Sequence, residues 1–173
     1  MNKRILDMTC GMRGIWFDKH HPAAIYCDRR KEHFVSEYGT VKAVRHIDVD
    51  PDVSCDFTNL PFDDGKFDLV VFDPPHLIGK DNSWIKKMYS YYPTKEDALR
   101  DIKKGFDEGM RVLRDGGVLI FKWAETSIPT RDIINAIGTE PLFGHRSGKK
   151  SNTHWMCFMK IPKDETYDTS CTS

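Results

Sequence analysis

Short apolar runs alternate with longer amphipathic segments along most of the chain. Three segments have helical periodicity: Lys31–Tyr38, Lys95–Leu113 and Thr130–Ile137. Six runs have the length and composition of strands: Arg4–Met8, Ala24–Cys27, Val53–Cys55, Phe67–Phe72, Gly117–Phe121 and Trp155–Ile161. Only a short helix fits between the first two strands. This alternation predicts an α/β fold with a mostly parallel sheet and helices on both faces.

The end of the chain departs from this alternation. Pro141–Gly144 and Thr153–Lys160 flank a polar turn that contains Gly148, and no helix is predicted between them. This arrangement predicts an antiparallel C-terminal hairpin at the edge of the sheet. Because residues 163–173 are polar, we expect one domain over residues 1–162 and a flexible tail over residues 163–173.

Composition and charge narrow the class of protein. The 173 residues include 26 basic and 26 acidic ones, so the net charge gives no argument for nucleic acid, although a local basic patch stays open. No apolar run is as long as a membrane span, and no signal-peptide pattern follows the N-terminus. The cysteines, Cys10, Cys27, Cys55, Cys157 and Cys171, lack zinc-site spacing. We expect reduced thiols, no metal, no membrane partner and a cytoplasmic location.

One predicted strand ends in residues that are typical of a ligand site. Phe72 is followed directly by Asp73, Pro74, Pro75 and His76. The two prolines fix φ and have no N–H, so this segment is predicted to be a stiff, extended tip with a carboxylate and free carbonyls. Open α/β sheets bind ligands at the carboxyl ends of their strands. The alternative is an ordinary proline turn.

Two further acids end the first and second predicted strands. Asp7 precedes Thr9, Cys10 and Gly11, where the glycine allows a ligand to approach the backbone and a following helix would offer free N–H groups. The loop is not GxGxxG, which disfavours a dinucleotide, and the acid suits a cofactor with an ammonium group. Asp28 is placed to accept from both ribose hydroxyls. A plain tight turn is the alternative for the first loop.

The third predicted strand is followed by Asp56 and Phe57. The carboxylate can accept from an adenine amino group, and Phe57 can supply an apolar face. The alternative is an Asx turn with Phe57 in the core. Asp48, Asp50 and Asp52 lack the glycine and glutamate of an EF-hand loop, so we interpret them as solvated acids.

In this order, the motifs resemble the class I S-adenosylmethionine-dependent methyltransferases. Within that class they are similar to the amino-methyltransferases with a (D/N)PP(Y/F/W/H) motif, which methylate exocyclic amines, most often N6 of adenine. The resemblance spans about Lys3 to Lys160 and includes Val112–Gly117, which resembles the family string VLKPGG. It implies a Rossmann-like fold. The first loop has fewer glycines than the usual DxGxGxG, and His76 replaces the more usual aromatic.

The resemblance also implies S-adenosylmethionine as the cofactor and a role for each motif. Asp28 would hold the ribose, and Asp56 and Phe57 would hold the adenine. The methionine end would be surrounded by the residues of the first loop: Asp7, Thr9, Cys10 and Gly11. Asp73 would both contact the cofactor and act in catalysis. The Asp73 carboxylate and the Pro74 carbonyl would accept the N–H bonds of the target amine and stabilise the positive charge that develops on nitrogen. Pro75 would stiffen the tip, and His76 would stack on the target base.

Other substrate contacts are expected around this tip. Trp84 belongs to the segment Leu77–Pro93, whose aromatic and lysine residues suit an unstacked nucleotide strand and equally suit simple loop packing. Lys122 and Trp123 continue past the fifth predicted strand, and one or the other is expected to line the same mouth, so both are candidate substrate-binding residues.

The sequence therefore predicts an S-adenosylmethionine-dependent N-methyltransferase acting on an exocyclic amine, with adenine N6 in RNA or DNA as first choice. Because the catalytic fold uses nearly all residues, no separate target-recognition domain is expected, which favours an unpaired or flipped base. A homodimer or a partner subunit stays open. The alternatives are another amine, such as cytosine N4, a protein glutamine or a small metabolite, and a non-catalytic methyltransferase-fold scaffold subunit. Four strand-end acids argue against the scaffold.

Overall fold

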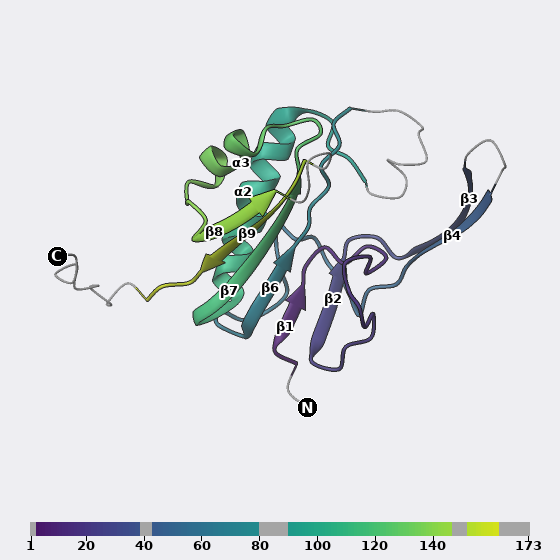
Figure 1. Cartoon of the computed structure of the whole chain (residues 1–173). Helices are drawn as coiled ribbons and strands as arrows, with labels where there is room; N and C mark the ends of the chain where they lie inside the picture. The colour runs from purple at the N-terminus through teal and green to yellow at the C-terminus, as the bar shows by residue number, and fades with distance from the viewer. Residues whose placement is uncertain (1–2, 39–42, 80–89, 147–151, 163–173) are drawn as a thin grey trace.

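A seven-stranded sheet forms the centre of the molecule (Figure 1). The computed structural model describes residues 3–38, 43–79, 90–146 and 152–162. The strand order is β5-β2-β1-β6-β7-β9-β8. The bounds are β1 Ile5–Asp7, β2 Ala24–Asp28, β5 Val53–Ser54, β6 Phe67–Phe72, β7 Leu113–Ala124, β8 Phe143–Arg146 and β9 Thr153–Met159. The neighbouring strands β5, β2, β1, β6 and β7 pair in parallel, whereas β9 pairs antiparallel with β7 and β8. The predicted mostly parallel sheet with an antiparallel C-terminal hairpin is confirmed.

Both helices that the sequence placed after β6 are present, α2 as Lys95–Val112 and α3 as Thr130–Ile137. The side chain of Thr94 caps α2 by accepting from the Asp97 backbone N–H at 3.1 Å. Helix α3 ends at Gly138, whose φ of 73° is in the left-handed region that glycine adopts readily. The predicted bounds of both helices are therefore correct to within a residue.

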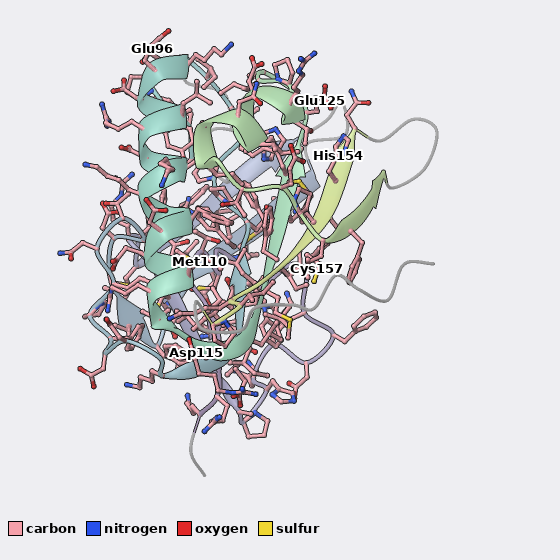
Figure 2. All side chains as sticks on the ribbon, turned by 90° about the vertical axis from the view of Figure 1, so that its left-hand side faces the viewer. Glu96, Met110, Asp115, Glu125, His154 and Cys157 are labelled. Atoms are coloured by element: carbon pink, nitrogen blue, oxygen red, sulfur yellow. The ribbon has the colours of Figure 1, made fainter. Side chains whose placement is uncertain are left out.

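The two helices pack against each other over one face of the sheet (Figures 1 and 2). Glycines let α2 lie close to the strands: a Cβ on Gly105 would lie 2.7 Å from the Phe72 ring, and one on Gly109 would lie 2.7 Å from Leu119. Among the described residues no helix covers the opposite face, so the expectation of helices on both faces is met on one face only. Over β1 and β2 that opposite face is covered by the β1–β2 loop, where Trp16 packs against Tyr26.

The predicted helix over Lys31–Tyr38 is wrong. This segment is strand β3, Glu32–Tyr38, and it pairs antiparallel with β4, Ala43–Val49, in a hairpin that projects from the main sheet (Figure 1). The positions of its apolar residues also fit a helical period, but tertiary pairing with β4 determines the structure. Ile47 and Val49 of β4 are buried and pack with Phe34, which supports the base of the hairpin.

The short helix expected between β1 and β2 is also absent. Residues 8–23 form a series of turns, in which Gly11 has a φ of 48° and Arg13 a φ of 55°. These positive values are incompatible with a right-handed helix at this point. The Arg13 guanidinium lies 3.9 Å from the centre of the Tyr26 ring and donates to the carbonyls of Lys19 and Asp50 at 2.6 and 2.7 Å. The loop is therefore held in part by the contacts of this arginine instead of by helical hydrogen bonds.

Two further expectations concern the ends of the chain and membranes. The tail expected over residues 163–173 lies outside the described residues, and the domain boundary stays a prediction. Within the described ranges, no helix is long and apolar enough to cross a membrane.

Candidate functional site

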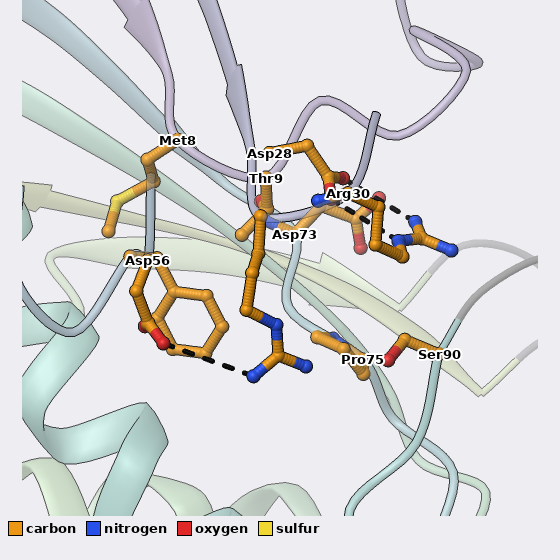
Figure 3. Close-up of a pocket in the computed structure, with 10 residues that line it drawn as sticks. Met8, Thr9, Asp28, Arg30, Asp56, Asp73, Pro75 and Ser90 are labelled. Carbon is orange, nitrogen blue, oxygen red and sulfur yellow. Dashed lines mark hydrogen bonds and ion pairs between the residues drawn. The ribbon is translucent and has the colours of Figure 1, made fainter. Parts of the chain in front are cut away.

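Three cavities follow one another along the carboxyl ends of β1, β2 and β6. The first, here the tip cavity, has a volume of about 230 Å³ and lies between the β1 loop and the proline tip. The second, the central cavity, has about 60 Å³ and is shown in Figure 3. The third, the outer cavity, has about 440 Å³ and extends toward the start of α2. Neighbouring cavities share lining residues, so they lie side by side, and we call the three together the trough.

The tip cavity brings together most of the residues predicted for the methionine end and for catalysis. Its lining includes Asp7, Thr9, Cys10, Gly11, and all four tip residues from Asp73 to His76. Lys122 also lines it, as predicted. The central cavity adds Asp28, and both the central and the outer cavity are lined by Asp56 and Phe57. The predicted order of the strand-end motifs is thus their order along the trough.

The β1 loop and the proline tip are fixed to each other by hydrogen bonds. The Asp73 backbone N–H donates to Thr9 Oγ1 at 2.8 Å, and the Thr9 backbone N–H donates to Asp7 Oδ1 at 3.2 Å. Strands β1 and β6 are parallel neighbours, with Asp7 opposite Val71. Because of these contacts, the two halves of the tip cavity have a defined separation.

Asp7 is a deeply buried acid, only 1% exposed. Its Oδ2 accepts from the Trp16 indole N–H at 2.7 Å. Burial raises the pKa of Asp7 to about 7, and the hydrogen bonds from Trp16 and Thr9 oppose this rise. A cation in the tip cavity would favour the ionised form of this carboxyl. The structure is compatible with the predicted contact to an ammonium group.

Asp28 is held at the central cavity from two sides. The Gly11 backbone N–H donates to Asp28 Oδ2 at 3.0 Å. The backbone N–H and the Nε of Arg30 donate to Oδ1 at 2.9 and 3.2 Å. A carboxylate has about four acceptor positions, so it can also accept from ligand hydroxyls. In Figure 3, Asp28, Arg30 and Asp73 gather at one side of the cavity, and Asp56 lies across from them.

Asp56 forms the Asx turn that was the alternative at this position, yet it also lines the trough. Its Oδ1 accepts from the Thr58 backbone N–H at 2.9 Å and from the Thr58 hydroxyl at 2.8 Å. Its Oδ2 lies 3.9 Å from the Arg29 guanidinium. The Phe57 ring packs on Phe72, with ring centres 5.4 Å apart, and still lines the central and outer cavities. The structural and the ligand-binding interpretations therefore hold together.

The Asp73 carboxylate forms an ion pair with Lys122 of β7. Lys122 Nζ donates to Asp73 Oδ2 at 2.6 Å, and both side chains are about one-fifth exposed. Burial raises the pKa of Asp73, whereas the Lys122 ammonium lowers it. The pair arises because β6 and β7 are parallel neighbours with Phe72 opposite Phe121, so the residues that follow each of them meet. The sequence placed Lys122 at the mouth but did not predict this pair.

His76 lines the tip cavity next to Asp73. Burial lowers the pKa of His76, so the neutral imidazole is favoured. The His76 carbonyl accepts from the Thr126 hydroxyl at 3.0 Å, which ties the end of the tip to the segment after β7. A neutral ring suits the predicted stacking role, which stays a prediction.

Two predicted substrate contacts are not found in the trough. Trp123 is fully buried, and its indole N–H donates to the Ile128 carbonyl at 3.0 Å. Consecutive strand residues point to opposite faces, so Trp123 packs on the face of α2 while Lys122 lines the cavity. The prediction that Trp123 lines the mouth was therefore wrong. Trp84 lies outside the described residues.

Two lining residues were not singled out from the sequence: Arg29 and Arg30. Arg29 and Arg30 directly follow Asp28, so their position after a strand-end acid was an available signal. Tyr92, one of the aromatic residues of Leu77–Pro93, lines the outer cavity and belongs to the main apolar core, as the loop-packing alternative predicts. Tyr92 enters the outer cavity because the chain after the tip returns beside it, with an isolated bridge between Ile78 and Tyr92. No local sequence pattern indicates this return. The described residues contain no group of three or more His, Cys, Asp or Glu that could hold a metal.

Comparisons with known proteins identify the fold. No family model matches the sequence, and no curated protein does. The crystal structure of the PH0226 protein from Pyrococcus horikoshii OT3 is similar over 92% of this chain and 84% of its own, with a TM-score of 0.55 and 15% identity. The crystal structure of the [4+2]-cyclase SpnF has a TM-score of 0.43 and 16% identity, and the match covers 83% of this chain and 54% of SpnF. The Rossmann-like α/β fold predicted from the sequence is confirmed.

Proposed function

We propose that the chain is an S-adenosylmethionine-dependent N-methyltransferase that acts on a neutral exocyclic amine, with adenine N6 in RNA or DNA as the first candidate. One observation carries this proposal. The trough presents Asp7, Asp28 and Asp56 in linear order, in three neighbouring cavities. This order matches a ligand made of an amino acid, a ribose and a base.

The donor and acceptor groups along the trough fit such a ligand. Asp7 and the Gly11 backbone face the amino-acid end, and Asp28 offers a carboxylate to the ribose diol. Asp56 has one oxygen outside its Asx turn and can accept from an adenine amine. When bound, S-adenosylmethionine supplies an electrophilic methyl group on its sulfonium.

The residues of the tip prepare the amine for attack. An exocyclic amine is a weak nucleophile because its lone pair is delocalised into the ring. The Asp73 carboxylate and the Pro74 carbonyl accept its two N–H bonds, which favours a pyramidal nitrogen and stabilises the positive charge that develops there. The remaining acceleration comes from alignment of the amine with the methyl group. His76 stacks on the base.

The Asp73–Lys122 pair indicates the charge of the substrate. Because Lys122 already neutralises Asp73, a cationic amine gains little by entering the tip cavity. A neutral aromatic amine or a carboxamide needs only hydrogen-bond acceptors. This favours a base or a glutamine side chain over a lysine-like substrate. The base is the first candidate because His76 gives an aromatic surface beside the acceptors.

The test uses cofactor binding and product identification together. Wild type, Asp28→Ala and Asp73→Ala are titrated with S-adenosylhomocysteine by calorimetry. We expect Asp28→Ala to bind at least tenfold more weakly, since it loses hydrogen bonds to a charged group worth about 1.5–3 kcal/mol. Asp73→Ala should bind nearly as tightly as wild type but transfer no methyl group.

Methyl transfer is followed with isotopically labelled S-adenosylmethionine, total RNA and total DNA, and mass spectrometry of nucleosides. Label in N6-methyladenosine or its deoxy form supports the first candidate. Label in no nucleoside, with intact cofactor binding, would move the proposal to a protein or metabolite amine. Failure of wild type to bind S-adenosylhomocysteine would contradict the enzyme and favour a scaffold.

A further inference from the structure

One face of the main sheet is apolar and faces away from the two helices. The register of β6, β7, β9 and β8 places their outward-facing side chains side by side in two rows. One row crosses the sheet through Val71, Ile120, Cys157 and Phe143, and the other crosses it through Leu69, Val118 and Met159. We call these seven residues the open face.

The alternate residues of the same strands show that the sheet is apolar on both faces. Val70, Leu119 and Phe158 point the other way and belong to the main apolar core. The Phe158 ring packs on Phe106 of α2, with ring centres 4.9 Å apart. Strands that are apolar on both faces are typical of sheets that are covered on both sides. Among the described residues, however, no helix lies over the open face (Figure 1).

The part of the open face next to β8 is strongly exposed. Phe143 is 69% exposed and Met159 is 41% exposed, and close to them in the chain Leu142 is 55% and Ile161 43% exposed. A side chain of this size presents about 150–200 Å² when fully exposed, so these four leave roughly 300–400 Å² of apolar surface in solvent. An apolar patch of this size is often an interaction site.

The chemistry of the open face indicates which partner it fits. Its seven side chains carry no charge, and Lys122, which borders them on β7, already pairs with Asp73, so the face offers little to the phosphates of a nucleic acid. The segments that adjoin β8 and β9 in the chain, residues 147–151 and 163–173, are too polar to supply an apolar cover. An apolar surface is complementary to a second copy of itself, as a two-fold symmetric interface requires.

The size of the open face also fits a dimer. A stable interface buries about 800 Å² on each partner, and about 65% of a homodimer interface is apolar, which is roughly 500 Å². The four exposed side chains supply most of this area, and the half-buried Val118 and Ile120 extend it. Because β8 is the edge strand of the sheet, a second copy can reach the face from that edge.

We propose that the open face is a homodimer interface, in which two copies of the chain pack their β7, β9 and β8 faces together about a two-fold axis. Phe143 is the main contact, since it is the most exposed member of the face. Lys122 borders the face and lines the tip cavity, so the second copy lies close to the candidate site. The inference does not depend on the proposed function, because it rests on packing alone.

The test is Phe143→Glu in the full chain, compared with wild type by sedimentation equilibrium at micromolar concentrations. Wild type should have twice the chain mass of 20.0 kDa, and the variant should have the mass of one chain. We expect the dissociation constant of the dimer to rise about a hundredfold or more, because the substitution places an unpaired charge in an apolar contact. A second variant, Met159→Lys, changes the same face from β9 and should weaken the dimer in the same direction.

The matched control is Phe17→Glu. Phe17 lies in the β1–β2 loop, outside the open face, and its side chain is fully exposed. The same substitution there makes the same change in net charge and should leave the dimer intact. Circular dichroism should show the wild-type fold in both variants, because neither side chain is buried.

Two results would overturn the proposal. A wild-type chain that stays monomeric at all these concentrations would show that no second copy covers the open face. A Phe143→Glu variant that dimerises as tightly as wild type would place the dimer interface elsewhere.

Discussion

Replacing Lys122 by methionine leaves the Asp73 carboxylate partly buried and without its cation. The structure gives one charge-assisted hydrogen bond of 2.6 Å between side chains that are 22% and 23% exposed. Hydrogen bonds to charged groups contribute about 1.5–3 kcal/mol to stability, and incomplete burial keeps this pair below the 3–5 kcal/mol lost on breaking fully buried pairs. We expect a coupling free energy of about 1.5–3 kcal/mol.

A double-mutant cycle measures this coupling. Wild type, Lys122→Met, Asp73→Asn and the double variant are unfolded with urea at about pH 7. The internal control is the Lys103–Asp107 pair on α2, which has a similar distance of 2.6 Å but is 42% and 57% exposed. The control pair should couple by only about 0.3–0.5 kcal/mol. A Lys122–Asp73 coupling no larger than that of the control would refute the reasoning.

The same pair predicts a dependence on pH with a definite sign. Burial raises the pKa of Asp73 and Lys122 opposes the rise, so Lys122→Met should raise it further. An acid with a raised pKa in the folded state favours folding while it is protonated, and this contribution is lost as the pH rises through the folded pKa. The stability gap between wild type and Lys122→Met should therefore widen with pH. The acid limb of the methyl-transfer rate should move to higher pH, because Asp73 must be ionised.

Two other predictions address the walls of the trough. The folded pKa of Asp7 is about 7, so wild type should lose about 2–3 kcal/mol of stability relative to Asp7→Asn between about pH 5 and pH 7. Urea titrations of both proteins measure this difference, and a difference that does not change with pH would contradict the prediction. Gly105→Ala places a Cβ 2.6 Å from the Phe57 ring and should weaken both folding, by about 1–3 kcal/mol, and S-adenosylhomocysteine binding. The reason for the weaker binding is that the added Cβ displaces Phe57, which lines the trough. In Gly109→Ala the Cβ contacts Leu119 instead, so this variant should weaken folding alone. Equal losses of S-adenosylhomocysteine affinity in both variants would exclude a displacement of Phe57.

The sequence was most informative at the ends of the parallel strands. Asp7, Asp28 and Asp73 come together because parallel neighbours present their carboxyl ends at the same edge of the sheet, so linear positions translate directly into proximity. Helical periodicity also gave the bounds of α2 and α3. Here local chemistry and the overall fold agree.

Elsewhere the decisive interactions were between segments distant in sequence. The apolar positions of Glu32–Tyr38 fit a helix or a strand, and only pairing with Ala43–Val49 selects the strand. The error at Trp123 was avoidable, since Lys122 and Trp123 are adjacent in a strand and cannot face the same side. For Tyr92 the sequence left a substrate contact and packing of the loop equally open, because its burial depends on how the chain returns after the tip.

The hydrogen bond between the Asp73 N–H and the Thr9 hydroxyl has a consequence for local opening. It joins the loop after β1 to the tip after β6, two interior strands of the seven-stranded sheet. We therefore expect the Asp73 amide to exchange its hydrogen more slowly than the amides of the β3–β4 hairpin. The β3–β4 hairpin pairs only with itself and can open at much lower free energy. Thermal fluctuations that open the periphery of the fold thus leave the geometry around Asp73 unchanged.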